Sequence, residues 1–165
     1  MAGFEAMRSR RGGVTAYFPV GLLLAAFIFL LPMPVSAKSA VDAAAKWGLI
    51  GTWALDCASK PSGANGHLSF LRGPEGRLIH KREFGDRRDE SRVLDTTIRP
   101  DGTLEVVIDF NRLTPPHKRR VVFSKVADDR KRAIENQVVG MPDFSVKDGK
   151  FISNGNPTPL QIRCR

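Results

Sequence analysis

The sequence predicts an all-β fold: a small antiparallel up-and-down barrel of about eight strands, preceded by a short helix. Stretches of alternating polarity recur roughly every 8–12 residues, with turn-forming residues between them. Cys57 and Cys164 lie in the first and last stretch. A disulfide requires Cα atoms within about 7 Å, so these two strands are expected to be neighbours, as in a closed barrel. A sandwich in which the same strands meet is the alternative.

Residues 1–37 predict a cleaved secretion signal. Arg10 and Arg11 belong to a basic start that leads into the apolar run 20–31, and Val35-Ser36-Ala37 provides the small residues of a cleavage site. The run is shorter than the ~20 residues of a membrane-spanning helix, so cleavage is favoured over a membrane anchor. General secretion is favoured over twin-arginine export. We expect one periplasmic or secreted domain, residues 38–165, with no stable membrane span and with its two cysteines paired.

A helix is predicted over residues 39–46, where Ser39 and Asp42 form a capping box ahead of three alanines. It is too short to be stable alone, so it is expected to dock on the strands. The predicted strands cover residues 51–58, 68–70, 78–84, 92–99, 103–111, 118–126, 132–139, 144–147, 150–153 and 158–164.

Turn residues and side-chain alternation give this prediction its detail. Turns are expected at 73–76, 100–102 and 148–149, and the charged residues 85–90 are interpreted as a connection. One strand has a clear apolar face, formed by Leu104, Val106, Ile108 and Phe110. In the last strand Leu160, Ile162 and Cys164 share a face, which predicts that Arg163 points away from the core.

The helix, the Gly51-Thr52-Trp53 opening of the first strand and the bridge to the C-terminus together resemble the lipocalin (calycin) pattern. The resemblance implies that Trp53 closes one end of the barrel and that a late arginine, Arg163 or Arg165, packs over it. It also implies a barrel whose interior holds a small ligand.

Two further resemblances concern exported proteins. Residues 48–57, with Gly155, Thr158, Pro159 and Cys164, are similar to small exported α-proteobacterial proteins of unknown function, and this likeness implies no activity. A Trp-bearing first strand and a disulfide are also similar to small periplasmic barrels that inhibit secreted metalloproteases, although the cysteines of those proteins lie closer together.

The histidines do not predict a metal site. His67, His80 and His117 are scattered and are expected at the surface or the barrel rim. They match no His-x-His or His-Glu-x-x-His spacing. The sequence also has no Gly-x-Ser-x-Gly motif and no phosphate-binding glycine loop. We therefore predict no catalytic residues, no metal, no cofactor and a non-enzymatic protein.

The net charge of +9 favours anionic partners. For an exported chain these are lipids, cell-wall polymers or acidic proteins, and nucleic acid is not expected. Most basic clusters, including residues 130–132, are interpreted as solvated. Lys118, Arg119 and Arg120 are the candidate anion contact.

Two functional hypotheses follow. The first is a lipocalin-like protein that binds a small apolar or amphipathic molecule inside the barrel, with phenylalanines lining a cavity if the barrel is wide enough. A cavity above roughly 300 Å³ is its requirement. The alternative is an envelope interaction protein, inhibitor-type barrels included, whose basic face contacts an acidic protein, lipid or cell-wall polymer.

Overall fold

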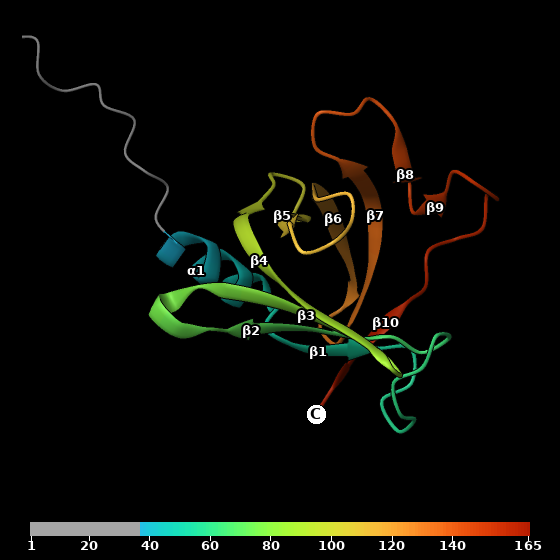
Figure 1. The fold of residues 1–165 in the computed structure, drawn as a ribbon, viewed down its shortest axis with the longest axis horizontal. Helices are drawn as coiled ribbons and strands as arrows, with labels where there is room; N and C mark the ends of the chain where they lie inside the picture. Colours follow the sequence, from blue (N-terminus) through green and yellow to red (C-terminus); the bar gives the residue numbers. More distant parts are fainter. Residues whose placement is uncertain (1–36) are drawn as a thin grey trace, which may run out of the picture. The chain divides into compact units, whose positions relative to one another are not determined.

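The computed structural model describes residues 37–165 (Figure 1). The predicted signal, residues 1–37, lies outside the described residues except for Ala37. The helical elements are α1 (Ala37–Trp47) and the short 3-10 helix η1 (Pro74–Gly76). The strands are β1 (Gly51–Ala54), β2 (His67–Arg72), β3 (Leu78–Phe84), β4 (Arg87–Ile98), β5 (Leu104–Phe110), β6 (His117–Ala127), β7 (Arg130–Val138), β8 (Phe144–Lys147), β9 (Lys150–Phe151) and β10 (Gln161–Cys164).

The sheet closes into an eight-stranded antiparallel barrel, as the sequence predicted. Strands that follow one another from β1 to β7 pair in order, and β10 pairs with both β1 and β7. The hairpin β8–β9 extends from β7 outside this ring. Closure pairs the two strands that would otherwise be exposed sheet edges.

The disulfide between Cys57 and Cys164 is confirmed. The Cα atoms are 5.3 Å apart and the cysteines are separated by 107 positions in the chain. Cys164 is in β10, opposite Thr52 of β1, so the bridge lies beside the pairing of the first and last strands. The cysteine positions therefore predicted the closure correctly.

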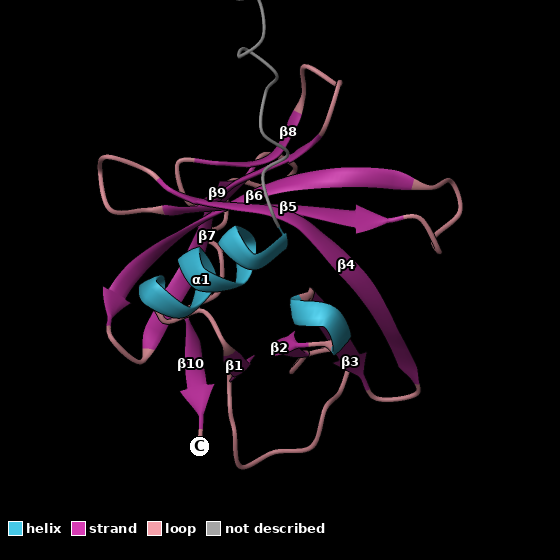
Figure 2. Ribbon diagram, turned by 90° about the vertical axis from the view of Figure 1, so that its left-hand side faces the viewer, coloured by secondary structure: helices cyan, strands magenta, loops and turns pink. Residues whose placement is uncertain are grey.

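Helix α1 covers one end of the barrel. Figure 2 shows it in front of the ring of strands. Its buried residues Val41 and Ala44 belong to the main hydrophobic cluster. Trp47 Nε1 donates a hydrogen bond to the Gly102 carbonyl (2.8 Å) and Thr96 Oγ1 donates one to the Ala40 carbonyl (2.5 Å), which fixes the helix to the β4–β5 turn region. The helix begins two residues before the predicted cap at Ser39.

The charged segment 85–90 is mostly strand rather than the predicted connection. Only the turn at Gly85 and Asp86 separates β3 from β4. Residues of opposite charge face each other across the two strands, namely Arg82 and Asp89, Glu83 and Arg88, and Lys81 and Glu90. Cross-strand pairs of opposite charge stabilise a sheet, so these side chains extend the ladder instead of interrupting it.

The predicted facing of β10 is wrong. Gln161 pairs with Lys131, and its Oε1 accepts a hydrogen bond from the buried Lys131 Nζ, while the Arg163 guanidinium lies 6.0 Å from the Trp53 ring centre. Arg163 also donates a hydrogen bond to the Ile50 carbonyl (2.5 Å). Gln161 thus points to the interior, and Arg163 lies on the same side as its partner Trp53 although it is exposed to solvent, whereas Ile162 and Cys164 mark the other face.

Candidate ligand-binding site

A cavity of about 370 Å³ occupies the barrel and opens to solvent. Its apolar walls include Ile108 and Phe110 from β5 and Val121 and Phe123 from β6. Hairpin β8–β9 adds Val146 and Phe151, and no lining residue comes from α1. The volume exceeds the roughly 300 Å³ that ligand sites usually require. The space inside the barrel is therefore large enough for a small molecule.

The floor of the cavity covers a buried lysine. Lys131 has no exposed surface, and its Nζ lies 4.1 Å, 4.9 Å and 5.7 Å from the ring centres of Phe123, Trp53 and Phe70. The same Nζ donates a hydrogen bond to Gln161 Oε1 (2.5 Å). Phe123 and Gln161 line the cavity, so Lys131 lies directly behind its wall.

Burial lowers the pKa of Lys131 to about 7. Three aromatic faces and one amide oxygen take the place of water around the ammonium group, and both kinds of contact favour its charged form. The sequence interpretation of residues 130–132 as a solvated cluster is therefore wrong for Lys131. Lys131 lies two positions before Ala133, which lines the cavity, and residues two apart in a strand point to the same face. This spacing is the signal that could have predicted an inward-pointing Lys131.

Trp53 is buried beside the ammonium group of Lys131. Its side chain is 1% exposed, and its Nε1 donates a hydrogen bond to the Leu49 carbonyl (2.8 Å). The indole thus satisfies its one polar atom locally. Its ring provides one face of the Lys131 cage and packs against Arg163.

His80 is buried, which contradicts its predicted place at the surface or rim. It is 4% exposed, lines the cavity and stacks on Phe70 with ring centres 4.4 Å apart. Burial, with smaller contributions from the charges of Arg82 and Lys131, lowers the pKa of His80 to about 3, so its imidazole is neutral. Its Nδ1 has no hydrogen-bond partner among the described residues. A buried nitrogen without a partner is unusual in a native protein.

The other two histidines lie in different places. His117 lines the cavity and is half-buried. His67 contacts the Ser59 carbonyl and the Asn65 amide on the β1–β2 connection. Within residues 37–165, no group of three or more His, Cys, Asp or Glu side chains is arranged to hold a metal ion.

Arg119 and His117 form a polar group in the cavity wall. His117 Nδ1 contacts the Pro115 carbonyl (2.9 Å), and a carbonyl only accepts, so Nδ1 carries the proton. His117 Nε2 then accepts a hydrogen bond from Arg119 Nε (3.2 Å). Arg119 Nη1 donates to Asn136 Oδ1 (3.0 Å) and to Ser145 Oγ (3.3 Å). The guanidinium is thus held by neutral acceptors on three different segments.

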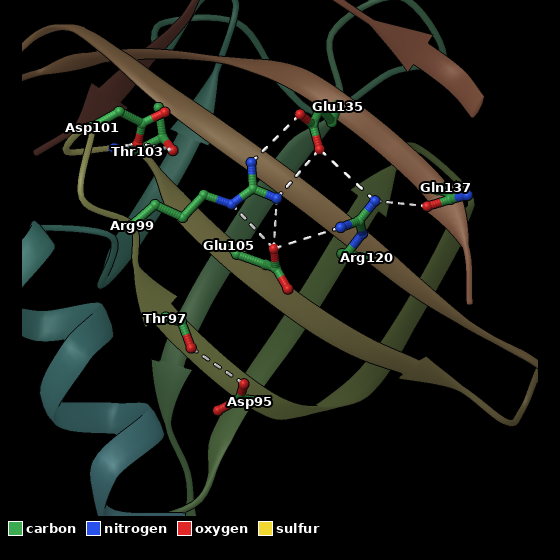
Figure 3. A network of polar contacts seen from close by, with 9 residues as sticks. All are labelled: Asp95, Thr97, Arg99, Asp101, Thr103, Glu105, Arg120, Glu135 and Gln137. Carbon is green, nitrogen blue, oxygen red and sulfur yellow. Dashed lines mark hydrogen bonds and ion pairs between the residues drawn. The ribbon is translucent and has the colours of Figure 1, made fainter. Parts of the chain in front are cut away.

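The candidate anion residues Lys118, Arg119 and Arg120 do not form one face. Arg119 lines the cavity, whereas Lys118 is exposed. Arg120 lies in a network of ion pairs with Arg99, Glu105 and Glu135 (Figure 3). Side chains alternate between the two faces of a strand, so three consecutive residues of β6 cannot all point the same way.

The network in Figure 3 neutralises the charge of Arg120. The guanidinium lies 3.8 Å from Glu105 Oε2 and 3.9 Å from Glu135 Oε2, and it donates a hydrogen bond to Gln137 Oε1 (2.7 Å). Arg99 binds the same two carboxylates. Each positive charge is matched by a negative one, which indicates a structural role for this cluster.

Replacement of Glu135 with glutamine should lower the free energy of unfolding by about 1 kcal/mol, because the group that contacts both Arg99 and Arg120 loses its charge. Urea unfolding of both proteins measures the difference. Since these side chains are partly exposed, we expect the difference to shrink in about 1 M salt. A salt-independent difference would show that packing, and not charge, stabilises the cluster.

No helix among the described residues is long and apolar enough to cross a membrane. Comparison with protein-family models, with curated proteins and with solved structures found no match to this chain.

Proposed function

We propose that this protein binds a small apolar or amphipathic molecule inside its barrel and does so without catalysing a reaction. The cavity of about 370 Å³ carries this proposal. Its walls combine aromatic and aliphatic side chains with a few polar groups, which is the usual composition of small-molecule sites.

The proposal includes a lipocalin-like character for the barrel. Its support is the Gly51-x-Trp53 opening of β1, the helix before it and the late Arg163 beside the Trp53 ring. These features resemble the lipocalin pattern in residues that lie together in the fold.

We also propose that the protein works in the periplasm or outside the cell, after removal of residues 1–37. The disulfide between Cys57 and Cys164 supports this location, because such bonds persist in oxidising compartments and are rare in the cytosol. The envelope interaction hypothesis has less support, since Arg120 is neutralised by carboxylates and Arg119 faces the cavity.

Titration of the oxidised protein with 1-decanol should show saturable binding, because the alcohol is apolar along most of its length and its hydroxyl can satisfy a polar group in the cavity. Calorimetry measures the affinity, and amide chemical shifts locate the site. We expect the largest shifts in β5 and β6 near Ile108 and Val121, and the smallest in α1.

An alanine in the cavity wall offers a matched pair of variants. Ala133→Phe places a ring in the cavity and should weaken decanol binding about tenfold or more, whereas Ala127→Phe adds the same ring at an exposed site and should not. Circular dichroism checks that both variants fold, and Ala133→Leu serves if the larger ring prevents folding. Absence of decanol binding to the unmodified protein would contradict the proposal.

A further inference from the structure

Arg119 is a charged group in the cavity wall without a carboxylate partner. Among residues 37–165, no Asp or Glu oxygen lies within 4.0 Å of its guanidinium nitrogens, and no Asp or Glu lines the cavity. Two other arginines serve for comparison, Arg82 in the same cavity wall and Arg120 beside Arg119 in β6, and both are neutralised. Arg82 makes two hydrogen bonds to Asp89 (2.9 Å and 2.8 Å), and Arg120 contacts two glutamates.

The guanidinium of Arg119 is also fixed in orientation. Its Nε and Nη1 donate to His117, Asn136 and Ser145, and these acceptors bring no negative charge. With the proton on His117 Nδ1, its Nε2 accepts the hydrogen bond from Arg119 Nε. Nη2 has no hydrogen-bond partner among the described residues, so it retains donors for a ligand.

The rest of the cavity adds positive potential and limits the size of a ligand. The ammonium of Lys131 lies behind the wall formed by Phe123 and Gln161. A half-buried cation that lacks a counter-ion is costly to keep, and an anion in the cavity would compensate it. If a water-sized group takes about 30 Å³, a volume of about 370 Å³ holds about a dozen non-hydrogen atoms.

We propose that the ligand of this barrel is an amphipathic monocarboxylate of about a dozen non-hydrogen atoms, whose carboxylate pairs with Arg119 while its apolar chain lies against Phe110 and Phe123. This inference rests on the proposed function and names the class of molecule bound. The carboxylate is the one common biological headgroup that combines a single negative charge with the planar geometry that a guanidinium matches.

Three probes with a ten-carbon chain and one short probe test the class of ligand: decanoate, 1-decanol, decyltrimethylammonium and acetate. Calorimetry of the oxidised protein at low salt should give an affinity for decanoate about tenfold or more above that for decanol, no measurable binding of acetate, and the weakest binding among the long probes for the ammonium. The advantage of decanoate over decanol should decrease as salt is added, because salt screens the charge on the partly exposed Arg119.

Arg119→Met should weaken decanoate binding about tenfold to a hundredfold, the loss expected for one charged hydrogen-bonded contact, and should weaken decanol binding much less. Lys118→Met is the matched control, since it removes the same charge from the exposed neighbouring position and should change neither affinity.

The outcomes separate this inference from the proposed function. Equal affinity for decanoate and decanol, or an equal loss of both in Arg119→Met, overturns the carboxylate inference while the cavity remains a binding site. Loss of decanoate binding in Lys118→Met would overturn the assignment to Arg119. Failure of every probe to bind overturns both proposals.

Discussion

Replacement of both Cys57 and Cys164 with serine should lower the free energy of unfolding by about 4–5 kcal/mol, because the disulfide constrains a loop of about 100 residues in the unfolded chain. The two cysteines are 107 positions apart, so the bridge restrains nearly the whole described chain. Urea unfolding of the oxidised protein and of the double variant measures the loss. The same loss should follow when the unmodified protein is reduced.

The place of the disulfide in the barrel is a second reason to expect a large effect on the free energy of unfolding. Only three residue pairs join β1 to β10, and two join β10 to β7. The closing seam is thus short compared with the seven residue pairs that join β3 to β4. We expect amide exchange in the double variant to accelerate first at Ile162 and Arg163. If the double variant loses less than about 1 kcal/mol of its free energy of unfolding and its β10 amides stay protected from exchange, the closing seam holds without the disulfide.

Opening of this seam should also affect the cavity, because Gln161 of β10 is part of its wall. Reduction of the protein is therefore expected to weaken ligand binding before the barrel unfolds. An oxidising compartment would keep this disulfide intact and thereby favour the ligand binding proposed for the protein.

The barrel itself was predictable from the sequence. Turn residues at regular intervals defined most strands, and the two cysteines specified which strands meet. Apolar alternation worked best in β5, where Leu104, Val106, Ile108 and Phe110 are all buried. Such a strand has one apolar face and one polar face, so its orientation follows from the pattern alone.

The candidate site was less predictable because its important residues are polar and point inward. Lys131 and Arg119 both belong to basic runs, and a run of charges does not reveal which member faces the interior. The inner face of β10 carries Gln161 and Arg163, so the apolar alternation there indicated the wrong face. In each case tertiary contacts, and above all the need to partner the buried ammonium of Lys131, override the local pattern.

The stability of the protein should increase with pH above neutrality because of Lys131. Burial lowers its pKa from 10.5 to about 7 in the folded protein, while the unfolded chain keeps the higher value. Between these values the unfolded chain binds more protons than the folded protein, so the free energy of unfolding rises with pH. From this group alone we expect a rise of about 2 kcal/mol between about pH 7 and pH 9. Below pH 7 both states are protonated, and the contribution of Lys131 no longer changes.

Lys131→Met tests this assignment, since it removes the titrating group and keeps an unbranched side chain within the three aromatic rings. Urea unfolding across the same pH range should show that the rise is lost in Lys131→Met and retained in the exposed control Lys118→Met. No free thiol is present to complicate the alkaline measurements. Combining Lys131→Met with Gln161→Leu also removes the Gln161 amide oxygen, which would otherwise lose the hydrogen bond that it accepts from Lys131. If the free energy of unfolding still rises with pH in Lys131→Met, another group is responsible for the titration. If the free energy of unfolding of the unmodified protein does not change with pH, the three aromatic rings keep Lys131 charged throughout this range.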